Sequence, residues 1–309
     1  MTRSGTIALI GRPNAGKSTL VNALVGEKVT IVSDKPQTTR HRIVGVLTEA
    51  RGQAVLLDLP GVHRPLHRMN VQMMHVLRDT LAEVDAVLQL FDGAQEPGSG
   101  EEFVVTLLEH AEAPIILVPT KLDLPGVPER LAERVAFYTG RRHYAAVAPV
   151  SAVRGDGLDG LRDAFFAALP EGPPLLDASV ATTQTERFFV TELIREALLE
   201  RVAKELPFTS AVHLREFQEK ETARGPLLRL IVDIVVERES QKAIIIGRAG
   251  RMIRDIGSAA RARIETLLGV RVYLDLQAKV RPGWREDARF LSELEPLEAV
   301  MTPQHEETP

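Results

Sequence analysis

The chain has 309 residues, a length that favours two domains, and 44% of its residues are hydrophobic, which is enough to bury a core in each. Cysteine is absent, which excludes disulfide bonds and cysteine-ligated zinc. Its apolar runs are strand-sized, its first residues lack the organisation of a signal peptide, and its net charge is −4. These properties favour a soluble cytoplasmic protein over a membrane-spanning protein or a general nucleic-acid binder.

From the start to about residue 169, strand-like apolar runs alternate with helix-like stretches. The expected strands are 5–10, 42–49, 53–58, 84–91, 114–119 and 145–150. This alternation predicts an α/β fold in which helices cover both faces of a mostly parallel sheet. Ligands of such sheets bind at the carboxyl ends of the strands, and the motifs described next follow those ends.

Residues 11–18 read GRPNAGKS and follow the first expected strand, where the phosphate-loop pattern GxxxxGK[ST] belongs. Backbone N–H groups of this loop would surround nucleotide phosphates, Lys17 would reach the outer phosphates, and the Ser18 hydroxyl would face Mg²⁺. A merely glycine-rich turn is the alternative, and the flanking strand and helix argue against it. The residues assigned to the phosphates are Gly11, Arg12, Pro13, Asn14, Ala15, Gly16, Lys17, Ser18 and Thr19.

Two further segments are typical of proteins that contact Mg²⁺ and the terminal phosphate of a bound nucleotide. In the loop Lys35–Arg40, a threonine hydroxyl at Thr38 or Thr39 would complete the Mg²⁺ shell, and Thr39 is our choice. After the third strand comes DLPG, in which Asp58 would hold Mg²⁺ and the Gly61 N–H would meet the γ-phosphate. The segment assigned to this side of the nucleotide is Asp58, Leu59, Pro60, Gly61 and Val62. The predicted metal ligands are Ser18, Thr39 and Asp58, and the predicted catalytic residues are Lys17, Thr39 and Gly61.

The fifth strand leads into TKLD, which indicates the base. A carboxylate at Asp123 accepts hydrogen bonds from N1–H and the 2-amino group of guanine, and adenine offers no such pair of donors. The residues assigned to the base are Thr120, Lys121, Leu122 and Asp123, together with Ser151 and Ala152, a pair placed to add a backbone N–H to the guanine O6.

These motifs occur in the order found in translation-factor-related GTP-binding proteins, and residues 5–169 resemble that class. The resemblance implies a P-loop GTPase domain that binds GTP or GDP with Mg²⁺. Thr120 stands where the commoner family residue is asparagine, so we expect the bond between the base loop and the phosphate loop to be lost and affinity to fall. Val62 stands where many GTPases have a glutamine that orients water, so we expect slow intrinsic hydrolysis. Asn14 stands where related GTPases with asparagine use K⁺; the alternative is an asparagine that only stabilises its own loop.

The second half changes character after residues 170–183, which break both periodicities and contain three prolines. A helix is expected near 188–202, strands at 209–217 and 227–237, a short helix ending in Ile244–Ile246, a basic helix at 251–267 and a strand at 270–280. The order αββααβ predicts an α+β domain. Seven basic and two acidic residues lie between Arg238 and Arg263, so a basic face is expected in an acidic protein.

The sequence Gly247–Arg248–Ala249–Gly250 joins the two helices of this domain. A GxxG turn allows close approach of a sugar-phosphate chain and points the positive end of the next helix at it. With Arg248 in the turn and arginines after it, the segment resembles a KH domain of the second type. The residues assigned to single-stranded RNA are Ile246, Gly247, Arg248, Ala249, Gly250, Arg251 and Arg254. We expect Ile244–Ile246 to serve mainly as core.

A GTPase domain, a linker and a KH domain in this order resemble the Era family of bacterial ribosome-assembly GTPases, and KVRPGWR at 279–285 resembles a signature of that family. The division we expect is a P-loop GTPase domain at 1–169, a linker at 170–183, a type II KH domain at 184–282 and a C-terminal helix and tail at 283–309, with disorder after about 296. The resemblance implies GTP-dependent binding to the 3′ end of 16S rRNA in small (30S) ribosomal subunit assembly, by a monomer. Two alternatives remain: an RNA-binding factor in which nucleotide is a structural ligand, and a growth-regulating GTPase peripheral to the inner membrane.

Overall fold

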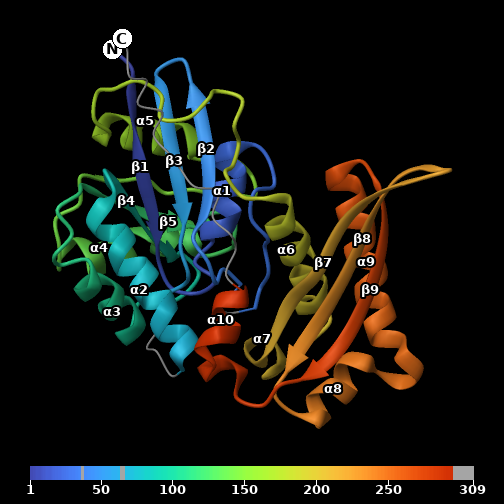
Figure 1. Cartoon of the computed structure of the whole chain (residues 1–309). Helices are drawn as coiled ribbons and strands as arrows, with labels where there is room; N and C mark the ends of the chain where they lie inside the picture. The colour runs from blue at the N-terminus through green and yellow to red at the C-terminus, as the bar shows by residue number, and fades with distance from the viewer. Residues whose placement is uncertain (36–37, 63–66, 295–309) are drawn as a thin grey trace.

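The structure is a computed structural model that describes residues 1–35, 38–62 and 67–294. Pro36 and Gln37 of the expected loop Lys35–Arg40, and the expected disorder after residue 296, lie outside these residues. We refer to the segment 26–42, which contains that loop, as the first switch, and to residues 58–62 as the second switch. Within them the chain forms two sheets, one in each half of the sequence (Figure 1).

Six strands form the sheet of the N-terminal half, in the order β2-β3-β1-β4-β5-β6. The strands are β1 (Arg3–Ile10), β2 (Ile43–Glu49), β3 (Gly52–Asp58), β4 (Ala86–Asp92), β5 (Ile115–Thr120) and β6 (Ala146–Val147). Strand β2 runs antiparallel to β3, and all the other pairs are parallel. The predicted mostly parallel sheet is confirmed, with each strand within two residues of its expected start.

Alternate residues of the central strand β1 serve two hydrophobic cores, because successive side chains of a strand point to opposite faces. Ile7 and Leu9 pack with α1 (Lys17–Val25) and α5 (Leu158–Ala168). Ala8 and Ile10 pack on the other face, whose helices are α2 (Arg68–Glu83), α3 (Ser99–Leu107) and α4 (Val127–Thr139). Both faces are therefore covered, as Figure 1 shows, and the carboxyl ends of β1, β3 and β5 meet at one edge.

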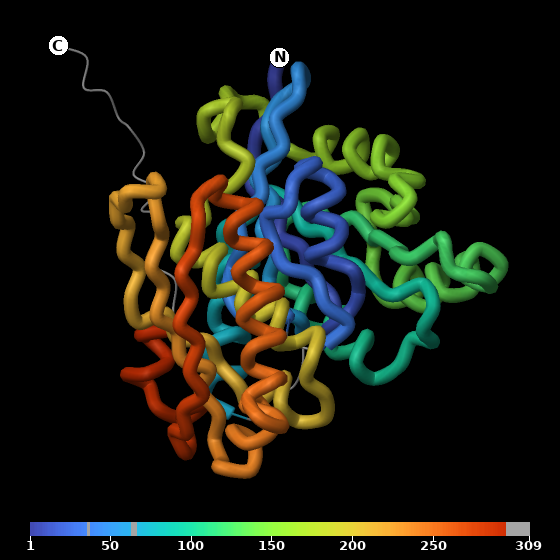
Figure 2. The backbone as a smooth tube through the Cα atoms, turned by 90° about the vertical axis from the view of Figure 1, so that its right-hand side faces the viewer, coloured from blue at the N-terminus to red at the C-terminus, as the bar shows by residue number. Residues whose placement is uncertain are grey.

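The second half has the predicted order αββααβ around a three-stranded sheet, β7-β8-β9. Its elements are α6 (Glu186–Leu199), α7 (Leu206–Thr209), β7 (Ser210–Thr222), β8 (Gly225–Val236), α8 (Glu239–Ile246), the 3₁₀ turn η1 (Arg248–Gly250), α9 (Arg251–Leu268) and β9 (Arg271–Val280). The short helix α7 was not predicted, and β7 continues five residues beyond its expected end. Strands β7 and β8 are antiparallel, and β8 and β9 are parallel. The edge strand β9 lies beside α9 (Figure 2).

Helices α6, α8 and α9 cover one face of this sheet through Ile194, Ile245 and Ile256. Part of the other face packs with the C-terminal elements η2 (Trp284–Glu286) and α10 (Ala288–Leu294), where Trp284 is fully buried. Met69 and Met73 of α2 belong to the same cluster. The two halves of the chain therefore share a hydrophobic core, in which each large buried side chain contributes about 1.5–3 kcal/mol.

The expected linker lies along the N-terminal sheet. The Gln53 side chain accepts hydrogen bonds from the N–H groups of Leu175 and Leu176, both at 2.8 Å. Farther on, the Thr182 hydroxyl donates to the carbonyl oxygen of Val44 in β2 at 2.6 Å. The segment leading to α6 is thus bonded to the edge strand of the N-terminal sheet.

Candidate functional site

The phosphate loop joins β1 to α1 in a left-handed turn. Asn14 has φ +65° and Gly16 has φ +86°, a region where glycine is favoured because it has no Cβ. Gly11 is held for a different reason: a Cβ there would lie 2.5 Å from the carbonyl oxygen of Leu90. The turn ends where α1 begins at Lys17, so the positive end of the α1 dipole faces the loop.

Lys17 is buried beneath this loop. Its ammonium donates to the carbonyl oxygens of Gly11 and Arg12, both at 3.2 Å. Burial lowers the pKa of Lys17, and the nearby Asp58 carboxylate opposes that shift. A buried cation surrounded by outward-facing amides favours an anionic ligand.

Hydroxyl groups from the start of α1 and from the segment between α1 and β2 meet at Asp58, at the carboxyl end of β3. Its Oδ2 accepts from the hydroxyls of Ser18 at 2.7 Å, Thr30 at 3.2 Å and Thr39 at 3.3 Å. Ser18 and Thr39 lie 3.0 Å apart. Thr30 was missed, because no motif marks it and only the fold brings it to the carboxylate.

This oxygen cluster fits a magnesium ion. The Asp58 carboxyl is fully buried, and within the described residues its Oδ1 has no hydrogen-bond partner. Burial raises the pKa of Asp58, opposed first by Lys17. Carboxylate and hydroxyl oxygens are the ligands Mg²⁺ prefers, and a divalent ion would stabilise the ionised carboxylate that burial disfavours. The three predicted ligands are therefore together.

The second switch segment packs directly on the phosphate loop. A Cβ at Gly61 would lie 2.8 Å from the backbone nitrogen of Pro13, so only glycine fits there. The Val62 N–H donates to the carbonyl oxygen of Gly11 at 3.0 Å, and its side chain is buried in the core. The position after the glycine thus carries no polar group that could orient water, as predicted from its residue type.

The base end of the site is assembled from β5 and the loop after β6. Asp123 Oδ1 accepts from the Ser151 hydroxyl at 2.6 Å, which holds the carboxylate in place. Lys121, with φ +62°, donates from its ammonium to Asp92 at 2.7 Å. The Ser151 N–H donates to the carbonyl oxygen of Asp156 at 2.9 Å. Of the expected pair, Ala152 is therefore the residue that would add a backbone N–H to the guanine O6.

Thr120 corrects an expectation from the sequence. Its hydroxyl lies 3.0 Å from the carbonyl oxygen of Ala15 and 3.0 Å from that of Phe91. A hydroxyl has one hydrogen to donate, and here it reaches the phosphate loop without an amide group. The connection between base loop and phosphate loop is retained, so the physical reason for expecting weaker affinity does not hold.

Two side chains of the phosphate loop contact segments outside that loop. The Asn14 amide nitrogen donates to the carbonyl oxygen of Asp34 at 2.7 Å and so joins the loop to the first switch. The Arg12 guanidinium lies 3.8 Å from the Glu101 carboxylate of α3. Any contribution of Arg12 to phosphate binding therefore comes from its backbone.

A second turn of unusual backbone geometry, Gly247–Gly250, lies between α8 and α9. Gly247 has φ 69° and ψ 177°, Ala249 has φ 52°, and Gly250 has φ 73°. A Cβ at Gly247 would lie 2.6 Å from that of Met252. Arg248, Arg251 and Arg254 are exposed around this turn, and no residue of the turn itself is buried. The turn can thus receive a sugar-phosphate chain at the N-terminus of α9.

Only the middle of Ile244–Ile246 belongs to the core. Ile245 is fully buried, whereas Ile244 is 48% exposed and Ile246 is 37% exposed. The expectation that all three serve mainly as core is wrong for two of them, because α8 is amphipathic and packs on the sheet through one face. The exposed pair is available as an apolar wall beside the GxxG turn.

A groove continues from the turn between α9 and β9. Its lining includes Ile253, Arg254, Gly257, Arg261, Tyr273 and Leu276. Tyr273 is 53% exposed and offers an aromatic ring on which a base can stack. Tyr273 lies in the expected last strand but was not predicted as an RNA contact. The residues of β9 that face the groove depend on how β9 pairs with β8, which the sequence does not show.

Comparisons with known proteins agree with this geometry. Residues 6–121 match the family described as 50S ribosome-binding GTPase, and residues 215–285 match the KH domain family. GTPase Era of Heliobacterium modesticaldum is 44% identical over 284 residues, 92% of this chain and 94% of the relative. GTPase Era of Geobacter metallireducens is 44% identical over 292 residues, 94% of this chain and 97% of the relative.

The chain belongs to the Era family of GTPases. A solved structure of Era in complex with MgGDPNP and nucleotides 1506–1542 of 16S ribosomal RNA matches 95% of this chain with a TM-score of 0.89 and 32% identity. A variant of Aquifex aeolicus Era bound to GDP and AlF₄⁻ matches with a TM-score of 0.88. Both matches cover 99% of the solved chain, so the Era fold extends over both halves of this protein.

The expected GTPase and KH organisation is therefore confirmed. Among the described helices, none combines the length and apolar character needed to cross a bilayer.

Proposed function

We propose that this protein is a GTP-hydrolysing switch that binds single-stranded RNA at the 3′ end of 16S rRNA during assembly of the small (30S) ribosomal subunit. The observation that carries the proposal is the combination, in one chain, of a guanine-selecting phosphate-loop site and an open GxxG groove. The match to Era in complex with MgGDPNP and a 16S rRNA fragment, over 95% of the chain, supports both the nucleotide and the RNA.

The nucleotide would lie along residues 11–19, with the guanine at Asp123 and the terminal phosphate toward Gly61. Lys17 would release its carbonyl partners and donate to the outer phosphates, where negative charge develops during phosphoryl transfer. Ser18, Thr39 and Asp58 would hold Mg²⁺, which supplies charge neutralisation between the β- and γ-phosphates. The Gly61 amide would donate to the γ-phosphate.

Intrinsic hydrolysis would be slow, because the buried Val62 cannot orient the attacking water. Steady-state phosphate release by the purified protein, without partners, should stay far below the rate of about 10 per second of an ordinary enzyme. A rate near that value would contradict this assignment.

A potassium ion beside Asn14 would supply part of the missing charge neutralisation. The Asn14 amide nitrogen is engaged with Asp34, which leaves the side-chain carbonyl as the atom able to coordinate a cation. The decisive comparison is phosphate release in KCl and in NaCl at equal ionic strength. Faster hydrolysis in KCl supports the ion, and equal rates reject it.

RNA would be received by residues 246–251 and Arg254, with Tyr273 as an added stacking surface. The test is crosslinking of the full chain to total RNA in the presence of GDPNP or GDP, followed by sequencing of the bound fragments. Enrichment of small-subunit rRNA ends with GDPNP supports the proposal. Random fragments in both nucleotide states would reject it.

We also propose that the protein is a cytoplasmic monomer. Its GTPase domain would end at residue 169, its linker at residue 183 and its KH domain at residue 282. A peripheral contact with the cell membrane would need the basic face of α9, which RNA binding already accounts for. Flotation with anionic vesicles, with and without competing RNA, separates the two uses of that face.

A further inference from the structure

Helix α6 carries three buried charged residues on the side that faces the GTPase half. Glu192, Arg195 and Glu196 are each 4% exposed, although charged side chains are almost never this buried unless they are paired. Their partners show what the burial achieves. Arg195 and Glu196 bond to the first switch, and Glu196 also bonds to Arg263 of α9.

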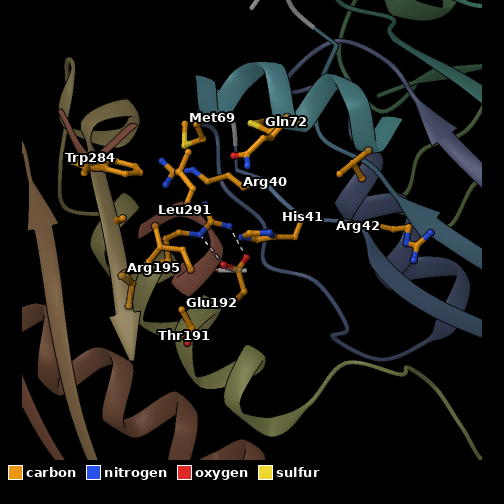
Figure 3. A pocket seen from close by; sticks show the side chains of 15 residues that line it. Arg40, His41, Arg42, Met69, Gln72, Thr191, Glu192, Arg195, Trp284 and Leu291 are labelled. Carbon is orange, nitrogen blue, oxygen red and sulfur yellow. Dashed lines mark hydrogen bonds and ion pairs between the residues drawn. The ribbon is translucent and has the colours of Figure 1, made fainter. Parts of the chain in front are cut away.

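Arg195 holds the backbone of the first switch. Its Nη2 donates to the carbonyl oxygen of Thr38, while its Nε donates to Glu192 Oε1 at 2.7 Å. Figure 3 shows the Arg195–Glu192 pair facing Arg40 and His41 of the switch. Thr38 is the peptide neighbour of Thr39, whose hydroxyl is a proposed Mg²⁺ ligand. The guanidinium therefore fixes the peptide that carries this ligand.

Glu196 connects the start of the same loop to the RNA-site helix. Its carboxylate accepts from the Lys28 ammonium at 2.7 and 2.9 Å and from the Val32 N–H at 3.3 Å. It also accepts from Arg263 of α9 at 3.1 Å. Helix α9 begins at the GxxG turn, so one buried carboxylate joins the RNA-site helix to the switch loop.

The proposal rests on the proposed function. We propose that Arg195 and Glu196 are positioning residues for GTP hydrolysis, through which RNA bound along α9 sets the placement of Thr39. Moving the switch loop away from α6 would take the Thr38 carbonyl from Arg195 and the Lys28 ammonium from Glu196, and the loss of a partner by a buried charge is unfavourable. In one position of the loop, the Thr39 hydroxyl contacts Ser18 and Asp58. The contacts of Arg195 and Glu196 therefore stabilise this loop position together with the packing of α6 on α9. Because coupling between two binding sites is reciprocal, RNA would then favour GTP over GDP, and GTP would favour RNA, by the same factor.

The test compares variants that differ only in whether they touch the switch. Glu196→Gln and Arg195→Gln remove the proposed contacts. Glu200→Gln is the matched control for Glu196, because Glu200 lies four residues later, at the C-terminal cap of α6, and pairs with the same Arg263 at 2.6 and 2.8 Å. Arg201→Gln, which removes a guanidinium bonded to Ala197 and Glu200, is the control for Arg195.

The readouts are the affinities for GDPNP and GDP, the Mg²⁺ concentration for half-maximal hydrolysis, and the affinity for a 16S rRNA 3′-end oligonucleotide in each nucleotide state. In Glu196→Gln and Arg195→Gln, the affinity for GDPNP should fall about 10-fold while that for GDP changes less than about twofold, and the Mg²⁺ requirement should rise. The ratio of RNA affinities with GDPNP and GDP should approach one. Glu200→Gln and Arg201→Gln should resemble the wild type in all readouts.

Equal losses of GDPNP and GDP affinity, with an unchanged Mg²⁺ requirement, would overturn the proposal and leave these contacts purely structural. Arg195→Lys keeps the positive charge without the fork that reaches Glu192 and Thr38 together, so it should show the same selective loss in a folded protein. A wild type that neither hydrolyses GTP nor binds this RNA would refute the proposed function itself. A wild type that does both, beside variants indistinguishable from it, would refute only the positioning roles.

Discussion

The molecule presents two glycine-bounded turns, each at the N-terminus of a helix, and they differ in how far they are enclosed. At the phosphate loop, Lys17 and Asp58 are buried and three hydroxyls converge on one carboxylate. At the GxxG turn, Arg248 and Ala249 are exposed and no residue of the turn is buried. Both turns place residues with positive φ at the start of a helix, but the first turn is enclosed and the second is open to solvent.

The difference follows from the ligand each turn would take. A mononucleotide can be enclosed, and enclosure strengthens every electrostatic interaction and makes a mispaired base costly. A polymer must enter and leave at both ends, so its turn stays open and depends on salt-sensitive contacts to phosphates. The predictions below test this contrast, beginning with the enclosed site.

The largest effect is expected from Lys17→Ala. Removing the buried cation from the enclosed site should lower GTP hydrolysis about 1000-fold, because no solvent can replace a preorganised charge there. RNA affinity without nucleotide should stay unchanged, since the open turn lies in the other half of the chain. Phosphate release and fluorescence anisotropy with a labelled oligonucleotide measure the two quantities. A parallel loss of RNA affinity would show that the nucleotide site serves RNA binding structurally.

At the open turn, Arg251→Ala combined with Arg254→Ala should lower RNA affinity about 30-fold at 0.1 M salt. The slope of log affinity against log salt concentration should become shallower by about 1.4, because two phosphate contacts to a single strand are lost. GTP affinity should be unaffected. Arg224→Ala, at the exposed tip of the β7–β8 hairpin, is the control. An unchanged salt slope would mean that neither arginine contacts phosphate.

Between the two turns, His41 gives the domain interface a pH dependence. Burial lowers the pKa of His41 to about 4, with Arg195 and Arg40 adding to the effect and Glu192 opposing it. The unfolded chain therefore takes up this proton near pH 6.5 and the folded chain only near pH 4. The free energy of unfolding should fall by about 2 kcal/mol as the pH drops from 6.5 to 4. The partial exposure of His41 to solvent limits this effect.

Chemical denaturation of the wild type and of His41→Asn at several pH values isolates this contribution. The variant should lose less stability than the wild type over that interval. Identical slopes would assign the acid sensitivity to other groups.

The sequence alone was sufficient to predict site residues wherever a short motif restricts the residue types at a strand end. The phosphate loop, DLPG and TKLD each need a particular residue type at a strand end, and the structure brings them together. It was insufficient where two halves of the chain meet. Glu192, Arg195 and Glu196 look like the solvated face of an amphipathic helix, and only the packing of α6 on the switch buries them. Thr30 and Tyr273 were not predicted for a different reason, because neither lies in a motif and only the fold within its own half brings it to its site.

The smallest effect concerns Thr120, whose hydroxyl reaches the carbonyl oxygens of Ala15 and Phe91. Thr120→Val keeps the shape of the side chain and removes the one hydrogen that the hydroxyl can donate to these buried carbonyl oxygens, so GTP affinity should fall about fivefold, equivalent to about 1 kcal/mol. Thr120→Asn restores a donor and should change affinity less than about threefold. If Thr120→Asn instead binds GTP at least about tenfold more tightly, the hydroxyl is a poor substitute for the amide, and the connection seen here contributes little to holding the base loop on the phosphate loop.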